Sequence, residues 1–137
     1  MVTLNDMLSY IEDKNILLIN SDWGKLSSLS LMDNDKNCTI VLNDNRIAEL
    51  SKKEKLAHET GHCETGAFYT PKTLNLRSRC EYKADEWAIK KLIPRDELIE
   101  IFEKGMTNIW QVAEHFEVTE DFAKKACKFY GYYNEAI

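Results

Sequence analysis

The sequence lacks the segments that would carry a chain into or across a membrane. No apolar run approaches the roughly 18 residues that a membrane span needs. The N-terminus has no basic segment followed by an apolar one, which excludes a secretory signal of the usual kind. Internal repeats, linkers and low-complexity stretches are missing as well. For a chain of 137 residues we therefore expect a single domain that lies in the cytoplasm.

Positive charge is also scarce. Lysine and arginine number 18 against 23 aspartates and glutamates, which gives a formal net charge of −5. Proteins that bind nucleic acid in general need clustered lysines and arginines to contact phosphates. The composition argues against such a surface over the whole molecule, and it leaves room only for a local basic patch.

Cysteines are few and have no C-x-x-C spacing. They stand at positions 38, 63, 80 and 127. In a chain without a secretory signal we expect reduced, mostly buried thiols. Because their number is even, a disulfide stays open as the less favoured alternative.

Hydrophobic spacing indicates helices and a small sheet. The predicted helices cover about residues 3–12, 51–66, 79–93, 94–104, 108–116 and 120–130. The predicted strands cover 16–19, 26–32 and 38–42, and Asp33-Asn34-Asp35 has the composition of a hairpin turn. This order predicts an α+β fold, in which a small antiparallel N-terminal sheet packs on a helical core that ends in a C-terminal helix pair.

The pentapeptide His58-Glu59-Thr60-Gly61-His62 is the strongest chemical signal. Residues four apart return to nearly the same face of a helix, so both imidazoles can reach one metal ion. Glu59, one residue further round, can lie beside a metal-bound water and accept its proton. The motif is typical of zinc-type hydrolases, usually peptidases. The alternative is an ordinary helix with two surface histidines.

The surroundings of the motif favour a helix. Ser51 and Glu54 have the form of a capping box at its start, and Gly66 is suited to its end. Gly61 inside the helix costs about 1 kcal/mol relative to alanine. Either this cost is simply tolerated, or another backbone or a substrate approaches too closely for a side chain.

A catalytic zinc takes three protein ligands and keeps one open position. Glu81 is the best candidate for the third ligand, as in metallopeptidases built like thermolysin, where a downstream glutamate completes the site. Asp85, one turn further on, is suited to orienting a metal-bound imidazole. Two other interpretations of Glu81 remain: it caps its own helix together with Ser78, or it lies on the surface. Two imidazoles and a carboxylate suit zinc, with manganese as the alternative.

A peptidase also needs a hydrogen-bond donor for the developing oxyanion. Tyr69, Arg77, Tyr82 and His115 are the candidates, and the sequence does not choose among them. For His115, on an apolar short helix, simple packing is the competing interpretation.

Two motifs in order resemble the ImmA/IrrE family of metallo-endopeptidases. The first is Ala57-His58-Glu59-Thr60-Gly61-His62-Cys63 with Thr65-Gly66-Ala67-Phe68, and the second is Glu81-x-x-Ala84-Asp85-x-Trp87-Ala88, which ends at Leu92-Ile93-Pro94. With the preceding Val41-Leu42-Asn43, the resemblance covers roughly residues 38–94. It implies His58, His62 and Glu81 as metal ligands and Glu59 as catalytic base. It also implies a cytoplasmic protease that cuts the repressor of a phage or mobile element.

The C-terminal helix pair resembles a helix-turn-helix, with Lys124, Lys125 and Lys128 on its second helix. The acidic residues Glu114, Glu117, Glu120 and Asp121 surround the turn and would face phosphates unfavourably. We expect the pair to pack on the protease or to dock a substrate, and we do not expect it to bind DNA. Its aromatic residues, among them Trp110, Phe116 and Phe122, are expected in the core.

These observations predict a metal-dependent endopeptidase in one domain, residues 1–137. We place its catalytic core at about 38–104 and the helix-turn-helix-like pair at about 105–137. The chain has no room for a DNA-binding repressor domain, so the expected substrate is a separate helix-turn-helix repressor. One alternative is a non-catalytic metal-binding regulator that acts by binding protein or DNA, and another is a hydrolase of small molecules. The sequence does not predict an oligomeric state.

Overall fold

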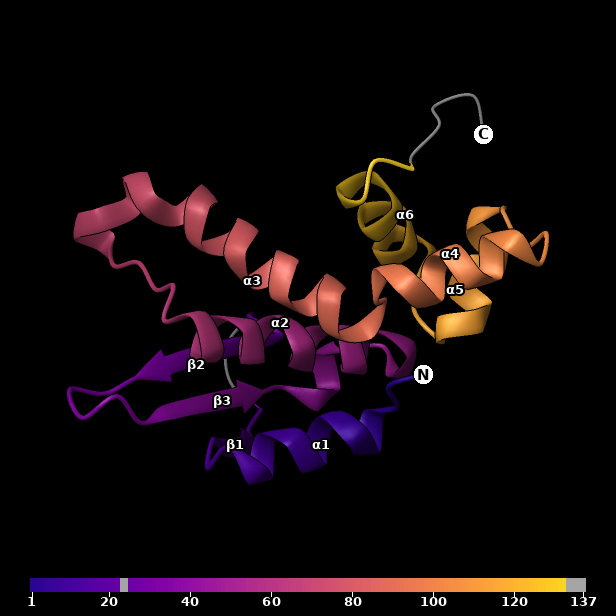
Figure 1. The fold of residues 1–137 in the computed structure, drawn as a ribbon. Helices are drawn as coiled ribbons and strands as arrows, with labels where there is room; N and C mark the ends of the chain where they lie inside the picture. The colour runs from indigo at the N-terminus through magenta and orange to yellow at the C-terminus, as the bar shows by residue number, and fades with distance from the viewer. Residues whose placement is uncertain (23–24, 133–137) are drawn as a thin grey trace.

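The computed structural model describes residues 1–22 and 25–132 (Figure 1). Its strands are β1 (Leu17–Asn20), β2 (Ser28–Met32) and β3 (Cys38–Leu42). Its α-helices are α1 (Leu4–Asp13), α2 (Lys52–Thr65), α3 (Arg77–Leu92), α4 (Arg95–Glu103), α5 (Ile109–Phe116) and α6 (Glu120–Phe129). Short 3-10 helices cover Asp44–Arg46, Glu49–Ser51 and Pro71–Leu76. The predicted α+β class is confirmed. None of the described helices combines the length and the apolar character that crossing a membrane requires.

The sheet has the order β1-β3-β2. The predicted hairpin is present, because β2 runs antiparallel to β3 and places Ser28 opposite Leu42. However, β1 runs parallel to β3, with Leu17 opposite Thr39, so the sheet is mixed and the prediction of an antiparallel sheet is wrong for β1. The alternation of side chains along a strand encodes which face is buried, and it carries no information on the direction of the neighbouring strand.

The described residues form two apolar core clusters. Helix α2 lies between α1 with the sheet on one side and helices α3 to α6 on the other (Figure 1). In the first cluster, Ile40 on the inner face of the sheet packs with Ile11 of α1 and Leu56 of α2. In the second, Ala57 of α2 joins apolar residues of α3 to α6 such as Leu92 and Phe116. Neighbouring residues of α2 therefore pack into different clusters, which fixes the rotation of this helix about its axis.

The C-terminal pair supplies most of its apolar residues to the second cluster, as predicted. Val112, Phe116 and Phe122 are buried. Trp110 is an exception to the prediction, because 55% of its surface is exposed. It lies in the first turn of α5, directly after Ile109, which does pack against the cluster.

The predicted capping box at the start of α2 is wrong. Ser51 has helical backbone angles and its side chain makes no capping hydrogen bond. The Glu54 carboxylate instead accepts hydrogen bonds from the backbone N–H of Thr119 (2.6 Å) and from its hydroxyl (2.8 Å). Glu54 therefore joins α2 to the start of α6. At the other end of α2, Gly66 adopts the predicted left-handed conformation with φ 66°.

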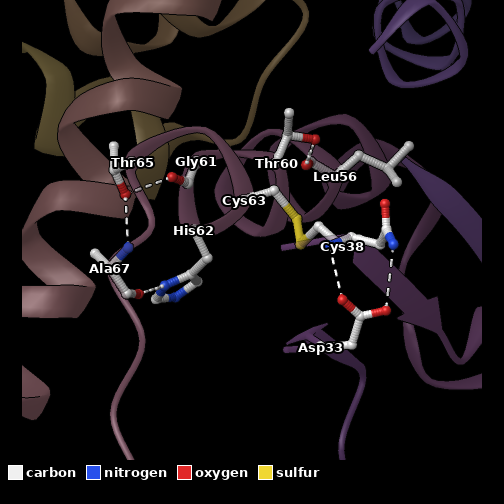
Figure 2. The surroundings of a disulfide bond; sticks show 10 residues. Asp33, Cys38, Leu56, Thr60, Gly61, His62, Cys63, Thr65 and Ala67 are labelled. Carbon is white, nitrogen blue, oxygen red and sulfur yellow. Dashed lines mark hydrogen bonds between the residues drawn. A yellow bond between two sulfur atoms is a disulfide. The ribbon is translucent and has the colours of Figure 1, made fainter. Parts of the chain in front are cut away.

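The prediction of four reduced cysteines is wrong for two of them. Cys38 of β3 and Cys63 of α2 form a disulfide with their Cα atoms 5.8 Å apart (Figure 2). The two residues are 25 positions apart in the sequence, and only the packing of β3 on α2 brings them together. Cys80 and Cys127 are buried free thiols, as predicted. The disulfide ties the sheet to the residue that directly follows His62.

Candidate metal centre

The site lies where α2 and α3 come closest. A Cβ atom added to Gly61 would lie 2.6 Å from the carbonyl oxygen of Ala84 and 3.0 Å from its Cα atom. Both atoms belong to the backbone of α3, which cannot move aside as a flexible side chain could. Of the two interpretations of Gly61, close approach of another backbone is therefore the one that the structure supports. This contact sets the distance across which side chains of the two helices meet.

Side chains of α2 and α3 converge beside this contact. The Nε2 atom of His58 lies 2.8 Å from one oxygen of Glu81, and the Nε2 atom of His62 lies 3.2 Å from the other. The ligand atoms of these residues all lie within 4.8 Å of one another. The structure thus brings together the three predicted ligands.

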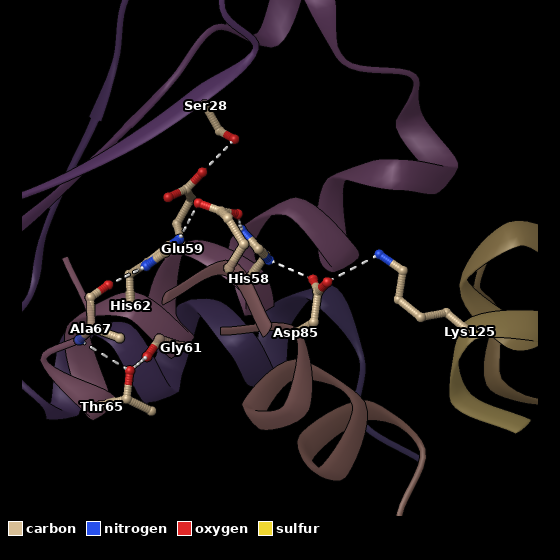
Figure 3. Close-up of polar contacts among 10 residues, drawn as sticks. Ser28, His58, Glu59, Gly61, His62, Thr65, Ala67, Asp85 and Lys125 are labelled. Carbon is tan, nitrogen blue, oxygen red and sulfur yellow. Dashed lines mark hydrogen bonds and ion pairs between the residues drawn. The ribbon is translucent and has the colours of Figure 1, made fainter. Parts of the chain in front are cut away.

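The other nitrogen of each imidazole is held by an acceptor (Figure 3). Nδ1 of His58 lies 2.8 Å from Asp85, and Nδ1 of His62 lies 2.6 Å from the carbonyl oxygen of Ala67. A carbonyl oxygen and a carboxylate accept hydrogen bonds, so both Nδ1 atoms carry the proton. Each neutral ring then presents the unprotonated Nε2 to Glu81, which is the tautomer that a metal ligand requires.

This arrangement is suited to a divalent cation. Two nitrogen lone pairs and a carboxylate converge within a few ångströms, and they repel one another unless a proton or a cation lies between them. Two imidazoles and one carboxylate are a known ligand set of catalytic zinc. The geometry does not support two of the competing interpretations, the surface histidines and the helix cap. His62 is only 5% exposed, and α3 starts at Arg77 without a side-chain cap, so Glu81 caps nothing.

Charges around His58 favour its protonated form when no metal is bound. Burial opposes this form, but the hydrogen bond to Asp85 and the charges of Asp85, Glu59 and Glu81 outweigh burial and raise the pKa of His58. Burial alone would raise the pKa of the Asp85 carboxyl. The hydrogen bond from His58 and the charge of Lys125 outweigh burial and lower this pKa. Nζ of Lys125 lies 3.3 Å from Asp85, so α6 contributes to the site.

Glu59 lies beside the three ligands and is 7% exposed. The hydroxyl of Ser28 donates a hydrogen bond of 2.7 Å to Oε2 of Glu59 (Figure 3). Sequence reasoning missed Ser28, because nothing distinguishes it from the other serines of residues 27–30. It also missed Lys125 as a neighbour of Asp85, having grouped it with the lysines of a helix-turn-helix.

A cavity of about 690 Å³ opens onto these residues. Besides the site residues, its walls include residues of β2, of the segment after α2, of the start of α3 and of α6, namely Ser28, Phe68, Tyr69, Arg77, Phe122 and Lys125. The cavity is therefore walled partly by the C-terminal helix pair, although we expected the catalytic core to end near residue 104.

The four candidate oxyanion donors separate into two groups. Tyr69 and Arg77 line the cavity. Tyr82 is 59% exposed and its ring packs near that of Phe129, with the centroids 6.4 Å apart. His115 lies on α5 with its ring 4.8 Å from that of Phe116. Among the described residues that line the cavity are Tyr69 and Arg77 but not Tyr82 or His115, so the geometry favours the first two as oxyanion donors.

Comparison with known families gives a match that covers most of the chain. Residues 11–128 match the profile of the IrrE N-terminal-like domain, the M78 peptidases. The chain belongs to this family. The match confirms the resemblance to ImmA/IrrE proteins, and it extends well beyond the motifs that carried the resemblance. In this M78 domain the matched residues include α5 and most of α6, so the C-terminal pair is part of it. No curated protein matches the sequence. Membership of a metallopeptidase family implies a bound metal and a protein substrate.

Proposed function

We propose that this chain is a metal-dependent endopeptidase in which His58, His62 and Glu81 hold a divalent cation and Glu59 is the general base. The convergence of the three ligand atoms within 4.8 Å, next to a buried glutamate, is the observation that carries the proposal. Two imidazoles and a carboxylate favour zinc, with manganese as the alternative.

The chemistry follows from the hydrogen bonds of the site. When bound, the cation would polarise the scissile carbonyl and acidify a water molecule. Ser28 donates a hydrogen bond to Oε2 of Glu59, and we assign Oε1 to accept the proton of the attacking water and to pass it to the leaving amine. Asp85 and the carbonyl of Ala67 keep the two imidazoles in the tautomer that the site needs. Tyr69, on the wall of the cavity, is our candidate to donate a hydrogen bond to the developing oxyanion.

For the substrate we propose a separate helix-turn-helix repressor of a phage or mobile element. The resemblance to the ImmA/IrrE family supports this choice, and membership of a peptidase family supports a protein substrate over a small molecule. The disulfide between Cys38 and Cys63 removes the argument from reduced thiols. A cytoplasmic location therefore rests on the nature of the substrate, because a transcriptional repressor acts where the DNA is.

We propose that the C-terminal pair forms part of the protease and does not bind DNA. Besides its packing on the apolar core, α6 makes three contacts with residues in or next to the site, which reduces the part of the helix that could enter a DNA groove. Thr119 is bonded to Glu54, Phe122 lines the cavity and Lys125 pairs with Asp85. Lys124 and Lys128 are exposed, and two lysines beside an acidic turn make a poor phosphate-binding surface.

Co-expression with the repressor encoded nearest to the chain tests the proposal. The wild type should produce a repressor fragment that disappears when a chelator removes the metal. Glu59→Gln keeps the size of the side chain and removes the base, so cleavage should fall by about 10³-fold or more while the zinc content stays unchanged. If Glu59→Gln still relieves repression fully, the chain acts as a metal-binding regulator and the protease proposal fails.

A further inference from the structure

The general base proposed above needs a fixed orientation. Glu59 has three rotatable side-chain bonds, and its carboxylate must present one oxygen to a water beside the ligand cluster. Burial alone does not set the rotation of a carboxylate about its last bond. In the described structure, the hydrogen bond to this carboxylate comes from Ser28, 31 positions earlier in the chain, with 2.7 Å between Oγ and Oε2.

The position of Ser28 is set by the sheet. It is the first residue of β2 and pairs with Leu42 of β3. The preceding carbonyl, that of Ser27, accepts a hydrogen bond of 2.9 Å from the backbone N–H of Asn43. Side chains alternate along a strand, so Ser28 and Ser30 point to the face that packs on α2, and Leu29 points to the other. The hydroxyl of Ser28 is therefore held from a separate element, independently of the rotamers of α2.

We propose that Ser28 is a positioning residue for Glu59. By donating to Oε2 it fixes the rotation of the carboxylate, and we assign Oε1 the role of accepting the proton of the water. When Oε1 accepts the proton of water, Oε2 is still an acceptor, so the Ser28 bond is kept before and after the transfer. The same bond thus holds the base in both of its protonation states. This inference rests on the proposed peptidase function, because it assigns Ser28 a role in proton transfer.

The matched variants are Ser28→Ala, Ser28→Thr and Ser30→Ala. Ser30 lies two residues further along the same face of β2, and no hydrogen bond joins it to Glu59 in the described residues. The intact repressor is the substrate, and kcat, KM, the Kd for zinc and the Tm are measured for each variant. Ser28→Ala should lower kcat about 10-fold with KM, zinc Kd and Tm close to the wild type. Ser28→Thr keeps the hydroxyl and should restore most of kcat, and Ser30→Ala should change kcat less than twofold.

A double variant separates positioning from a general effect on the strand. If Ser28 acts through Glu59, adding Ser28→Ala to Glu59→Gln should cause no further loss of the residual rate. If Ser28→Ala has the kcat of the wild type while Glu59→Gln is inactive, the inference is overturned and the proposed function stands. An equal loss in Ser30→Ala, or no rescue by Ser28→Thr, also overturns it. If the wild-type chain shows no metal-dependent cleavage, the proposed function itself fails.

Discussion

Helices α2 and α6 differ in what they bury. In α6 one side is apolar and buried, with Phe122 and Ala126, and the lysines of the helix are exposed. In α2 the buried residues include Lys53, Glu59 and His62 and lie on several sides of the helix. An amphipathic helix such as α6 needs only a core to pack on. Helix α2 instead buries polar side chains, and it is the helix that carries the candidate site. Departures from the amphipathic pattern are expected at functional sites.

Burial of polar groups in α2 is compensated one group at a time. The amine of Lys53 donates to the carbonyl oxygens of Val2 (3.0 Å) and Phe116 (2.6 Å), while burial lowers its pKa. The hydroxyl of Thr60 donates to the carbonyl of Leu56 at 2.6 Å. The two bonds of Lys53 reach the N-terminal segment and α5, so they also fix where α2 lies relative to these neighbours, whereas the bond of Thr60 stays within α2.

Exchanging glycine and alanine should give the largest difference between the two helices, both in the free energy of unfolding and in zinc binding. Gly61→Ala gains about 1 kcal/mol of helix propensity. The added methyl meets the backbone of Ala84 at 2.6 Å, so we expect a net loss of about 2 kcal/mol in the free energy of unfolding. Because α3 must shift, Glu81 moves and zinc binding should weaken as well. Urea unfolding and zinc titration measure both effects.

The opposite substitution in α6, Ala123→Gly, is the matched control for Gly61→Ala. It should cost about 1–2 kcal/mol through helix propensity and the lost methyl group, with zinc affinity unchanged. A stabilised Gly61→Ala protein would show that α2 and α3 do not approach as closely as described.

A smaller effect is expected where the two helices are joined. Glu54→Ala removes both hydrogen bonds to Thr119 and should lower the free energy of unfolding by about 1–2 kcal/mol. Thr119→Val should cost a similar amount, and the double variant should be less destabilised than the sum of the two. Glu120→Ala, an exposed change in the first turn of α6, is the control. Strict additivity of Glu54→Ala and Thr119→Val would contradict the contact.

The smallest effect concerns the pH dependence of the metal-free protein. The folded protein raises the pKa of His58 above its ordinary value of 6.5. The stabilisation from its protonated form is therefore complete below pH 6.5 and is lost as the pH rises through the pKa of the folded state. We therefore compare the free energy of unfolding of the wild type with that of His58→Gln at two pH values. The wild type should gain on the variant by up to about 1 kcal/mol when the pH is lowered from 9 to 5.5. Unfolding in urea with a chelator measures this difference, and a difference that grows with pH would contradict the assignment.

Much of the fold and of the ligand cluster could be predicted because their signals are local. The helices follow from apolar spacing, and the spacing of His58 and His62 places them on one face. Glu81 and Asp85 could be placed one turn apart on a second helix. For these residues, the type and spacing of the side chains carry the information.

What could not be predicted depends on contacts between distant segments. Ser28 reaches Glu59, and Cys38 reaches Cys63, only because β2 and β3 pack on α2. The parallel direction of β1 and the attachment of α6 through Glu54 are also absent from any local pattern. The sequence predicted that Glu54 would cap α2 together with Ser51. In the structure its carboxylate instead accepts the hydrogen bonds of Thr119.

The pairing of Asp85 with both His58 and Lys125 bears on attempts to transplant the site into another scaffold. A fragment that ends after α4 would keep every ligand of the cluster. It would lose the ammonium group that faces Asp85 and the aromatic ring of Phe122 from the cavity wall. A graft of the proposed site should therefore extend through α6, because a shorter one would carry the candidate ligands without the contacts that α6 supplies.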